Sequence, residues 1–168
     1  MKIVGLPPLV REDCRLLILG SMPGVASLKA QQYYGHPRNR FWPLLYRLLD
    51  GGEPNGSYDE RIRFALSRGV ALWDVLSVCE REGSLDSAIR EPEAGDFAAF
   101  YSRYQGIRHV FFNGRTASEL YRRHVLPTLR EEGALTYVTL PSSSPAHTLS
   151  LEAKLELWQP VREAWLKV

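Results

Sequence analysis

The 168 residues suffice for one domain with a substantial core, and 45% hydrophobic with 24% charged residues is ordinary for a globular protein. No apolar run reaches the roughly 18 residues of a membrane span, and residues 1–13 lack the pattern of a secretory signal. Cys14 and Cys79 stand outside any paired motif, which excludes a disulfide framework or a four-cysteine metal site from this chain alone. We therefore expect a single cytoplasmic domain, residues 1–168, without metal or cofactor.

The net charge of +2 is too small to indicate a nucleic-acid partner, but the charges are unevenly distributed. Residues 14–49 contain five Lys or Arg and no acid, and residues 102–130 contain six Arg against Glu119 alone. Such segregation would give one face a positive field suited to phosphates. Arginines that simply cover solvated helix faces explain the pattern equally well.

Short apolar runs and amphipathic stretches alternate along the chain. In chain order the expected elements are strand 16–19, helix 41–49, helix 59–68 ending at Gly69, strand 70–75, strand 109–113, a helix from about 114 towards 130, strand 135–140, and a helix that Ser150 caps and Pro160 kinks.

Strands that alternate with helices predict an α/β fold with a central, mainly parallel four-stranded sheet covered on both faces. Ligands of such sheets bind beyond the carboxyl ends of the strands. The four loops that follow the strands, GSMPG, SVCEREGS, NGR and PSSSPAHT, should therefore meet at one edge. We expect the functional site there.

The first of these loops, residues 20–24, is a tight Gly/Pro turn directly after a strand. Gly20 lets backbone N–H groups approach a ligand closely, and Pro23 stiffens the turn. Most turns of this composition are structural, and neither GxGxxG nor GxxxxGK[ST] is present. This loop alone does not identify a ligand.

The segment from Tyr33 to Trp42, YYGHPRNRFW, is more informative. A stacking ring, an amide and flanking cations such as Arg38 are what a pocket for an extruded base requires. Alternatives remain for each part: Phe41 and Trp42 can begin the buried face of a helix, Tyr33 can belong to the core, and Asn39 can cap the following helix.

The loop from Leu140 to Thr148 is rich in small hydroxyl residues, and His147 carries its one titratable side chain. Small polar residues with free backbone amides can hold a phosphate where long side chains would obstruct it. An ordinary serine-rich loop that caps a helix is the alternative. No GxSxG motif supports a serine nucleophile.

Taken in order, GSMPG, YYGHPRNRFW, FFNGRTA and LPSSSPAHTLS resemble the motifs of the uracil-DNA glycosylase superfamily. The segment GVALWDVLSVCEREGSLDSAI, together with LPSSSPAHT, is similar to the hypoxanthine-DNA glycosylase (DNA-deoxyinosine glycosylase) group within it. The resemblance runs from about residue 16 to residue 165. It implies a three-layer α/β/α domain that flips a nucleotide out of DNA and hydrolyses its N-glycosidic bond.

The resemblance also implies roles for individual residues. Tyr34 matches the aromatic position that stacks on the extruded base, and Asn113 lies near a position that contacts the base or helps the reaction. The first loop, Gly20, Ser21 and Met22, lines the base pocket. The last loop, with Ser142, Ser143, Ser144 and His147, grips the DNA backbone, to which we add Arg38 as a flanking cation.

Three departures bear on the mechanism. Met22 stands where uracil-specific branches carry an Asp or Asn that orients water; Ser142 replaces a histidine; and Ala146 replaces an intercalating leucine. In the hypoxanthine group the asparagine of HPxN takes over the catalytic role, so the resemblance points to Asn39 as the catalytic residue. We expect it to position water or to hydrogen-bond the departing base, with His36 as a further candidate donor.

Asp74 and Asp86 are the alternative carboxylates, although each can equally serve a structural purpose. No lysine occurs in the motifs, which disfavours Schiff-base chemistry and favours a monofunctional glycosylase. The expected partner is double-stranded DNA, with single-stranded DNA left open, and the expected state is a monomer. A mismatch-specific uracil/thymine glycosylase and an inactive DNA-binding relative are the alternative functions.

Overall fold

A computed structural model describes residues 2–130 and 135–168. Its larger sheet is parallel throughout, with the strand order β3-β2-β6-β7. The strands are β2 (Leu16–Gly20), β3 (Val70–Asp74), β6 (His109–Asn113) and β7 (Thr136–Leu140), each within one residue of the predicted bounds. All five residues of β2 are buried, because this central strand has a neighbour on each side and helices on both faces.

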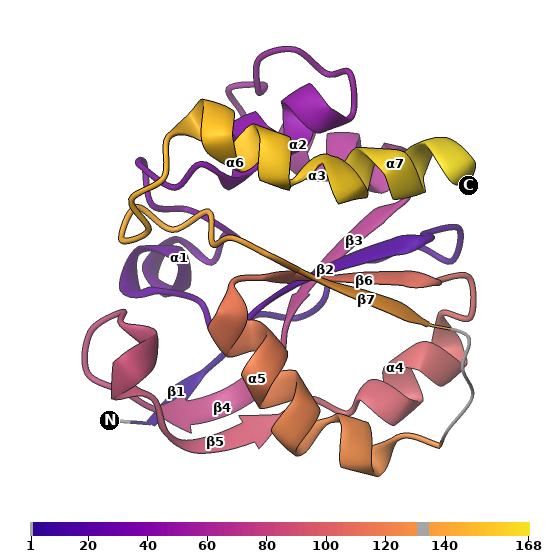
Figure 1. Cartoon of the computed structure of the whole chain (residues 1–168). Helices are drawn as coiled ribbons and strands as arrows, with labels where there is room; N and C mark the ends of the chain where they lie inside the picture. The colour runs from indigo at the N-terminus through magenta and orange to yellow at the C-terminus, as the bar shows by residue number, and fades with distance from the viewer. Residues whose placement is uncertain (1, 131–134) are drawn as a thin grey trace.

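Helices cover both faces of the sheet and give the predicted three-layer α/β/α architecture (Figure 1). One face carries α2 (Phe41–Leu48), α3 (Tyr58–Ser67), α6 (Leu151–Leu157) and α7 (Gln159–Lys167), and the other carries α4 (Phe97–Arg103) and α5 (Arg115–His124). Alternate residues of β2 enter the two cores. Leu16 and Ile18 pack with α2, whereas Leu17 and Leu19 pack on the α4 and α5 side.

Most predicted helix ends are confirmed. The Ser150 hydroxyl accepts a hydrogen bond from the Ala153 amide and caps α6. The helix is interrupted between α6 and α7, just before Pro160. The helix expected to run towards Arg130 is longer than the observed helix α5. Helix α5 ends at His124, and Pro127 follows in the 3-10 turn η2 (Leu126–Thr128), because proline cannot donate the backbone bond that would continue the helix.

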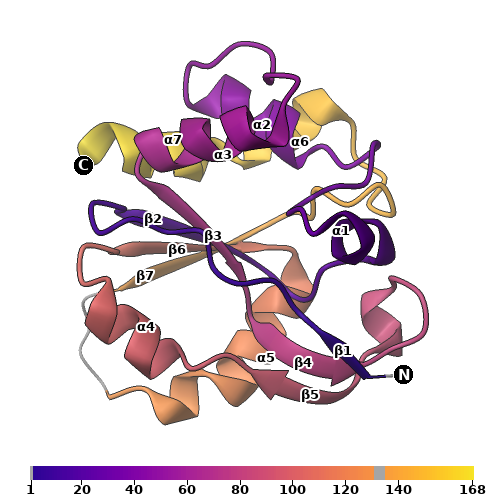
Figure 2. The same cartoon turned by 180° about the vertical axis from the view of Figure 1, so that it is seen from behind.

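A second, antiparallel sheet was not predicted. It consists of β1 (Lys2–Val4), β4 (Leu76–Glu80) and β5 (Arg90–Ala94) in the order β1-β4-β5, and it lies beside α5 (Figure 2). Residues 77–84, which we expected to form a loop, therefore begin as a strand. Two short elements also lie near the carboxyl ends of the parallel strands: the helix α1 (Val25–Ala30) and the 3-10 turn η1 (Asp86–Ala88). Within the described ranges, no helix is long and apolar enough to span a membrane.

Candidate active site

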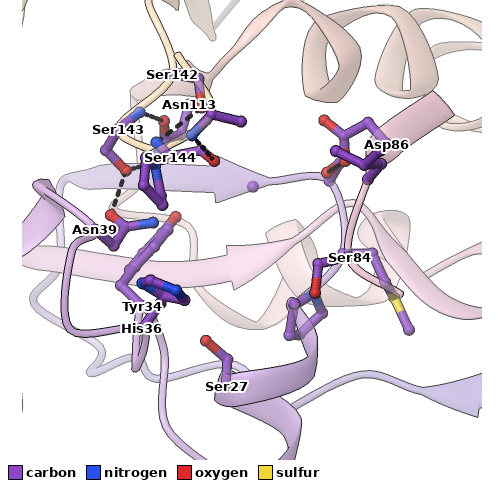
Figure 3. Close-up of a pocket in the computed structure, with 18 of the residues that line it drawn as sticks. Ser27, Tyr34, His36, Asn39, Ser84, Asp86, Asn113, Ser142, Ser143 and Ser144 are labelled. Carbon is purple, nitrogen blue, oxygen red and sulfur yellow. Dashed lines mark hydrogen bonds between the residues drawn. The ribbon is translucent and has the colours of Figure 1, made fainter. Parts of the chain in front are cut away.

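A cavity of about 420 Å³ opens where the parallel strands end. This volume lies within the roughly 300–1,000 Å³ typical of small-ligand pockets. Figure 3 shows Asn39, Tyr34 and His36 on one side of the cavity, with Ser84 and Asp86 across from them. The residues that line it are Gly20–Ser27, Tyr34, His36, Asn39, Asp74, Ser84–Ser87, Asn113 and Ser142–His147.

The structure brings together almost every site residue that the sequence predicts. The exception is Arg38, which is exposed and does not line the cavity. The segment Ser84–Ser87 was not assigned to the site, apart from the alternative at Asp86. Its position depends on the second sheet, because β4 leads into it and β5 leads away. In the sequence this segment was marked by the loop SVCEREGS, which ends at Ser84 and was expected at this edge, and by the stretch GVALWDVLSVCEREGSLDSAI that carries the resemblance to the hypoxanthine group.

Tyr34 presents one face of its ring to the cavity. The other face stacks on Phe41, with ring centroids 3.9 Å apart and an interplanar angle of 20°. The backbone of Tyr34 is left-handed, with φ of 56°, an uncommon conformation for a residue other than glycine. Burial, reinforced by the nearby Asp74, raises the pKa of the Tyr34 hydroxyl well above its ordinary value. A neutral, stacked ring is therefore available to a flat ligand on one face only.

Asn39 is held by two hydrogen bonds to the same side-chain oxygen. Its Oδ1 accepts from the Phe41 backbone amide at 2.9 Å and from the Ser143 hydroxyl at 2.8 Å (Figure 3). The bond to Phe41 satisfies one of the free amides at the start of α2, although the N-cap position itself belongs to Arg40 and not, as the alternative had it, to Asn39. Since both donors fix the oxygen, the Nδ2 amide group is the part of Asn39 left for the cavity.

Ser143 links Asn39 to Asn113, which ends β6. The Asn113 Nδ2 donates to the Ser143 hydroxyl at 2.9 Å, and the Ser143 amide donates back to Asn113 Oδ1 at 2.8 Å. The Ser143 carbonyl accepts from the Arg40 amide at 3.0 Å. Ser143 is 1% exposed, and each of its polar groups is engaged inside the protein. It therefore ties the last loop, the sheet and the segment before α2 into one network.

His36 has a defined role for only one of its ring nitrogens. Its Nδ1 lies 3.1 Å from the Arg38 backbone amide and accepts its hydrogen bond. The neutral ring must then carry its proton on Nε2. His36 lines the cavity, so that N–H is available as a donor to a ligand.

The last loop is held in place from below by a buried lysine. Lys154 on α6 is 1% exposed, and its Nζ donates to the carbonyls of Ser144 at 3.4 Å and His147 at 3.2 Å. Burial, with the nearby positive charge of Arg40, lowers the pKa of Lys154. The oxygens of Ser142 and Ser144 accept from backbone amides two residues further on, which leaves their hydroxyl protons free to donate. Lys154 lies outside the sequence motifs and was not predicted to belong to the site.

The floor of the cavity lies between the ends of β2 and β3. A side chain at Gly20 would collide with Asp74 Oδ1 and lie 3.4 Å from the Tyr34 hydroxyl, so the pocket needs glycine there for room. Met22 lines the cavity but is 7% exposed and packs into the core with Leu19. Its thioether contributes shape and no strong hydrogen bond.

Three charged groups, Asp74, Asp86 and Arg81, lie around the first loop. Asp86 Oδ1 accepts from the Ser21 hydroxyl at 2.7 Å, and Arg81, 4% exposed, donates to the Pro23 carbonyl at 2.6 Å. Asp74 is 5% exposed. Burial, reinforced by the charge of Asp86 and opposed by Arg81, raises the pKa of Asp74 to about 7. Within the described residues, no group of three or more His, Cys, Asp or Glu side chains could hold a metal ion.

A parallel sheet whose carboxyl-end loops supply one aromatic face, a fixed amide donor and a rim of hydroxyl groups fits an enzyme class that takes a nucleobase out of DNA. Comparison with known proteins names the family within that class. The chain belongs to the uracil DNA glycosylase superfamily, whose family model matches residues 7–166. The expected fold and the expected enzyme class, a DNA glycosylase, are thus confirmed.

Individual relatives agree with this placement. A hypoxanthine DNA glycosylase of Methanosarcina barkeri is 35% identical over 158 residues, which cover 94% of this chain and 96% of the relative. One of Methanosarcina acetivorans is 36% identical with the same coverage. The solution NMR structure of a Methanosarcina acetivorans protein assigned to the uracil DNA glycosylases superimposes with a TM-score of 0.82 at 32% identity and 99% coverage of both chains. A G/U mismatch-specific uracil DNA glycosylase of Schizosaccharomyces pombe is 26% identical over 92% of this chain and 51% of that protein.

Proposed function

We propose that this enzyme excises hypoxanthine from deoxyinosine in DNA by hydrolysing the N-glycosidic bond, and leaves an abasic site. The observation that carries the proposal is the fixed amide of Asn39, whose Nδ2 donor is left for a cavity of suitable size for one base. The two Methanosarcina relatives, similar over nearly their whole length, support the choice of base.

In this proposal Asn39 acts as a hydrogen-bond donor. Both acceptor positions of its oxygen are occupied, by Phe41 and Ser143, so the side chain has no free lone pair with which to take a proton from water. Its Nδ2 can donate to the base as the glycosidic bond breaks and negative charge builds up on the leaving purine. Donors aimed at developing charge are an effective form of catalysis, and an oxocarbenium-like sugar then needs only a weakly activated water.

Two other side chains complete the base pocket in this proposal. Tyr34 stacks on the extruded base with the ring face that Phe41 leaves open, and the His36 Nε2–H supplies a second donor. Gly20, Ser21 and Met22 form the wall beside the base, and Asn113 holds the Ser143 network from the end of β6.

In this proposal, residues at the rim of the cavity contact the DNA backbone. The hydroxyl groups of Ser142 and Ser144, the His147 ring and the exposed Arg38 are suited to phosphates. Ser143 is better suited to positioning Asn39, because its polar groups are engaged inside the protein. We propose that the enzyme acts on double-stranded DNA as a monomer, in the cytoplasm.

We propose a monofunctional reaction, without strand cleavage by the enzyme. The lysine near the cavity, Lys154, is buried beneath the last loop, and its Nζ is bound by two carbonyl groups. An amine held in this way is not presented to the sugar, as an imine-forming lysine would have to be. Borohydride should therefore trap no covalent complex with substrate DNA.

The decisive experiment measures excision from duplexes that carry deoxyinosine, uracil or xanthine, with alkali to reveal abasic sites. Release of hypoxanthine supports the proposal. Release of uracil without hypoxanthine would favour the mismatch-specific activity named for the Schizosaccharomyces relative. Release of no base from any duplex would favour the alternative of an inactive DNA-binding relative.

Two variants of Asn39 test its role as a donor. Asn39→Ala removes the amide, and Asn39→Asp keeps an oxygen for Phe41 and Ser143 but replaces the Nδ2 donor with a carboxylate oxygen. If the donor matters, both variants lose excision by about 100-fold or more, as for the loss of one donor to a developing anion. Asn39→Asp would instead be as active as wild type, or more so, if the residue activates water as an acceptor.

A further inference from the structure

Leu85 is an exposed apolar side chain at the cavity to which the proposed mechanism assigns nothing. It lines the cavity and is 62% exposed. Of the other large hydrophobic side chains that the described residues expose, Val25 alone lines the cavity as well. An isolated exposed leucine is common on protein surfaces. This one, however, lies at the edge of the proposed base pocket, where DNA must approach.

The chain on both sides of Leu85 is fixed to other elements of the site. The Val25 amide donates to the Ser84 hydroxyl at 2.8 Å, and the Ser21 hydroxyl donates to Asp86 Oδ1 at 2.7 Å. These bonds join the segment to the start of α1 and to the first loop. Leu85 lies between the two anchors and directly before η1. Its backbone is therefore held at the cavity, while its side chain remains open to solvent.

The anchored segment lies across the cavity from the residues that bind the base in the proposed mechanism. Figure 3 shows Ser84 and Asp86 on one side, with Tyr34 and Asn39 on the other. Leu85 comes between Ser84 and Asp86 in the chain, so it belongs to the side opposite the stacking ring. Asp86 is exposed, and its acidic side chain repels phosphates. This side is therefore suited to contact with bases rather than with the DNA backbone.

A nucleotide that leaves a duplex creates a gap in the base stack, and the lost stacking is part of the cost of base flipping. Proteins that unstack DNA commonly insert an apolar side chain between the neighbouring bases. On the last loop, Pro145 and Ala146 are exposed and line the cavity, but both side chains are short and stay close to the backbone. Leu85 is the longest exposed apolar side chain among the described residues of the cavity.

We propose that Leu85 enters the gap that the extruded nucleotide leaves, from the side of the cavity opposite Tyr34, and packs between the two neighbouring base pairs. This inference rests on the proposed glycosylase function, and it assigns the base stack of double-stranded DNA as the partner of this side of the site. Burial of the leucine between the bases removes its apolar surface from water and opposes the return of the base. Leu85 thus acts on the extrusion of the nucleotide and not on the bond that breaks.

Two substitutions of Leu85 test this role. Single-turnover excision is measured on deoxyinosine opposite cytosine in a duplex and on the same strand alone. Leu85→Ala should lose about tenfold in rate on the duplex, because most of the favourable burial is lost, and less than about twofold on the single strand, which has no paired stack to open. Leu85→Met keeps a long apolar side chain and should retain the duplex rate within about threefold.

Leu166→Ala is the matched control. Leu166 on α7 is 63% exposed, nearly the same as Leu85, and it does not line the cavity. Its truncation should leave both excision rates unchanged. Since both leucines are exposed, neither alanine variant should lower the melting temperature, which thermal unfolding checks.

Binding separates this inference from the proposed function, because it requires no excision. Affinities are measured for a duplex with a stable abasic-site analogue, which already contains the gap, and for the same duplex intact. Wild type should prefer the abasic duplex, and Leu85→Ala should lose about tenfold of that preference, whereas Leu166→Ala should keep it. If only Leu85→Ala loses the preference, Leu85 fills the gap even where no base is excised.

Three results would overturn the assignment: a wild type without preference for the abasic duplex, a Leu85→Ala variant that matches wild type in this preference, or equal losses of its excision rate on duplex and single-stranded DNA. None of the three contradicts the proposed excision of hypoxanthine, which the wild-type rate on deoxyinosine tests separately.

Discussion

Ser143→Ala is the substitution that separates positioning of Asn39 from contact with DNA. The Ser143 hydroxyl accepts from Asn113 Nδ2 at 2.9 Å and donates to Asn39 Oδ1 at 2.8 Å. Alanine removes both bonds, but the backbone bonds from Ser143 to Asn113 and from Arg40 to Ser143 remain. The last loop should therefore keep its position, while Asn39 is held only by the amide of Phe41.

The size of the effect follows from these two bonds. A buried hydrogen bond stabilises by roughly 0.5–1.5 kcal/mol, and a buried group left without a partner adds to the loss, so the variant should be about 1–3 kcal/mol less stable. With one of its two anchors gone, Asn39 can turn its amide away from the base. If that lost anchor is worth about 1.4 kcal/mol in the transition state, kcat falls roughly tenfold.

Ser142→Ala is the matched control, since it removes a neighbouring hydroxyl that bonds only the Ser144 amide among the described residues. Single-turnover rates at saturating enzyme should show a lower rate constant for Ser143→Ala with nearly unchanged DNA affinity. Ser142→Ala should show the reverse, a weaker affinity with nearly unchanged rate. The reasoning is refuted if Ser143→Ala weakens binding and leaves the rate constant intact, because Ser143 would then serve the DNA backbone.

Three further substitutions probe other parts of the site. Gly20→Ala places a Cβ against Asp74 Oδ1 and should reduce excision about 100-fold by displacing the base, with little change in the melting temperature if the carboxyl group can rotate. Lys154→Met keeps a buried apolar stem but strips two loop carbonyls of their donor, so calorimetry should show a loss of about 1–3 kcal/mol, together with weaker DNA binding. Tyr34→Phe keeps the ring that stacks on Phe41, and an unchanged rate would show that the buried hydroxyl takes no part in excision.

The parallel sheet was predictable because three of its strands, β2, β3 and β6, are apolar on both faces. Such runs, with Leu16 and Ile18 facing one core and Leu17 and Leu19 the other, stand out from the polar segments between them. The antiparallel sheet is different. Its strand β5 reads REPEA and is mostly exposed, so neither hydrophobic alternation nor strand propensity marks it. Its pairing with β4 depends on contacts between distant residues.

The members of the site could be predicted more readily than their connections. Aromatic, amide and hydroxyl residues in short Gly/Pro-rich segments pointed to Tyr34, Asn39 and the last loop. The sequence did not show that Ser143 bonds to Asn39, 104 positions away, or that Lys154 supports the loop from α6. Such partners come from packing between elements that no local pattern encodes.

The proposed mechanism also explains why Met22 at the third position of the first loop is compatible with catalysis. A side chain there that binds water is needed only if the water must be activated before the base leaves. In the proposed mechanism the opposite order holds: Asn39 offers a donor rather than an acceptor, and His36 presents an N–H. Such groups stabilise negative charge on the leaving base rather than take a proton from water. Once the base carries the charge, the sugar cation reacts with any water within reach, and Met22 has only to shape the wall.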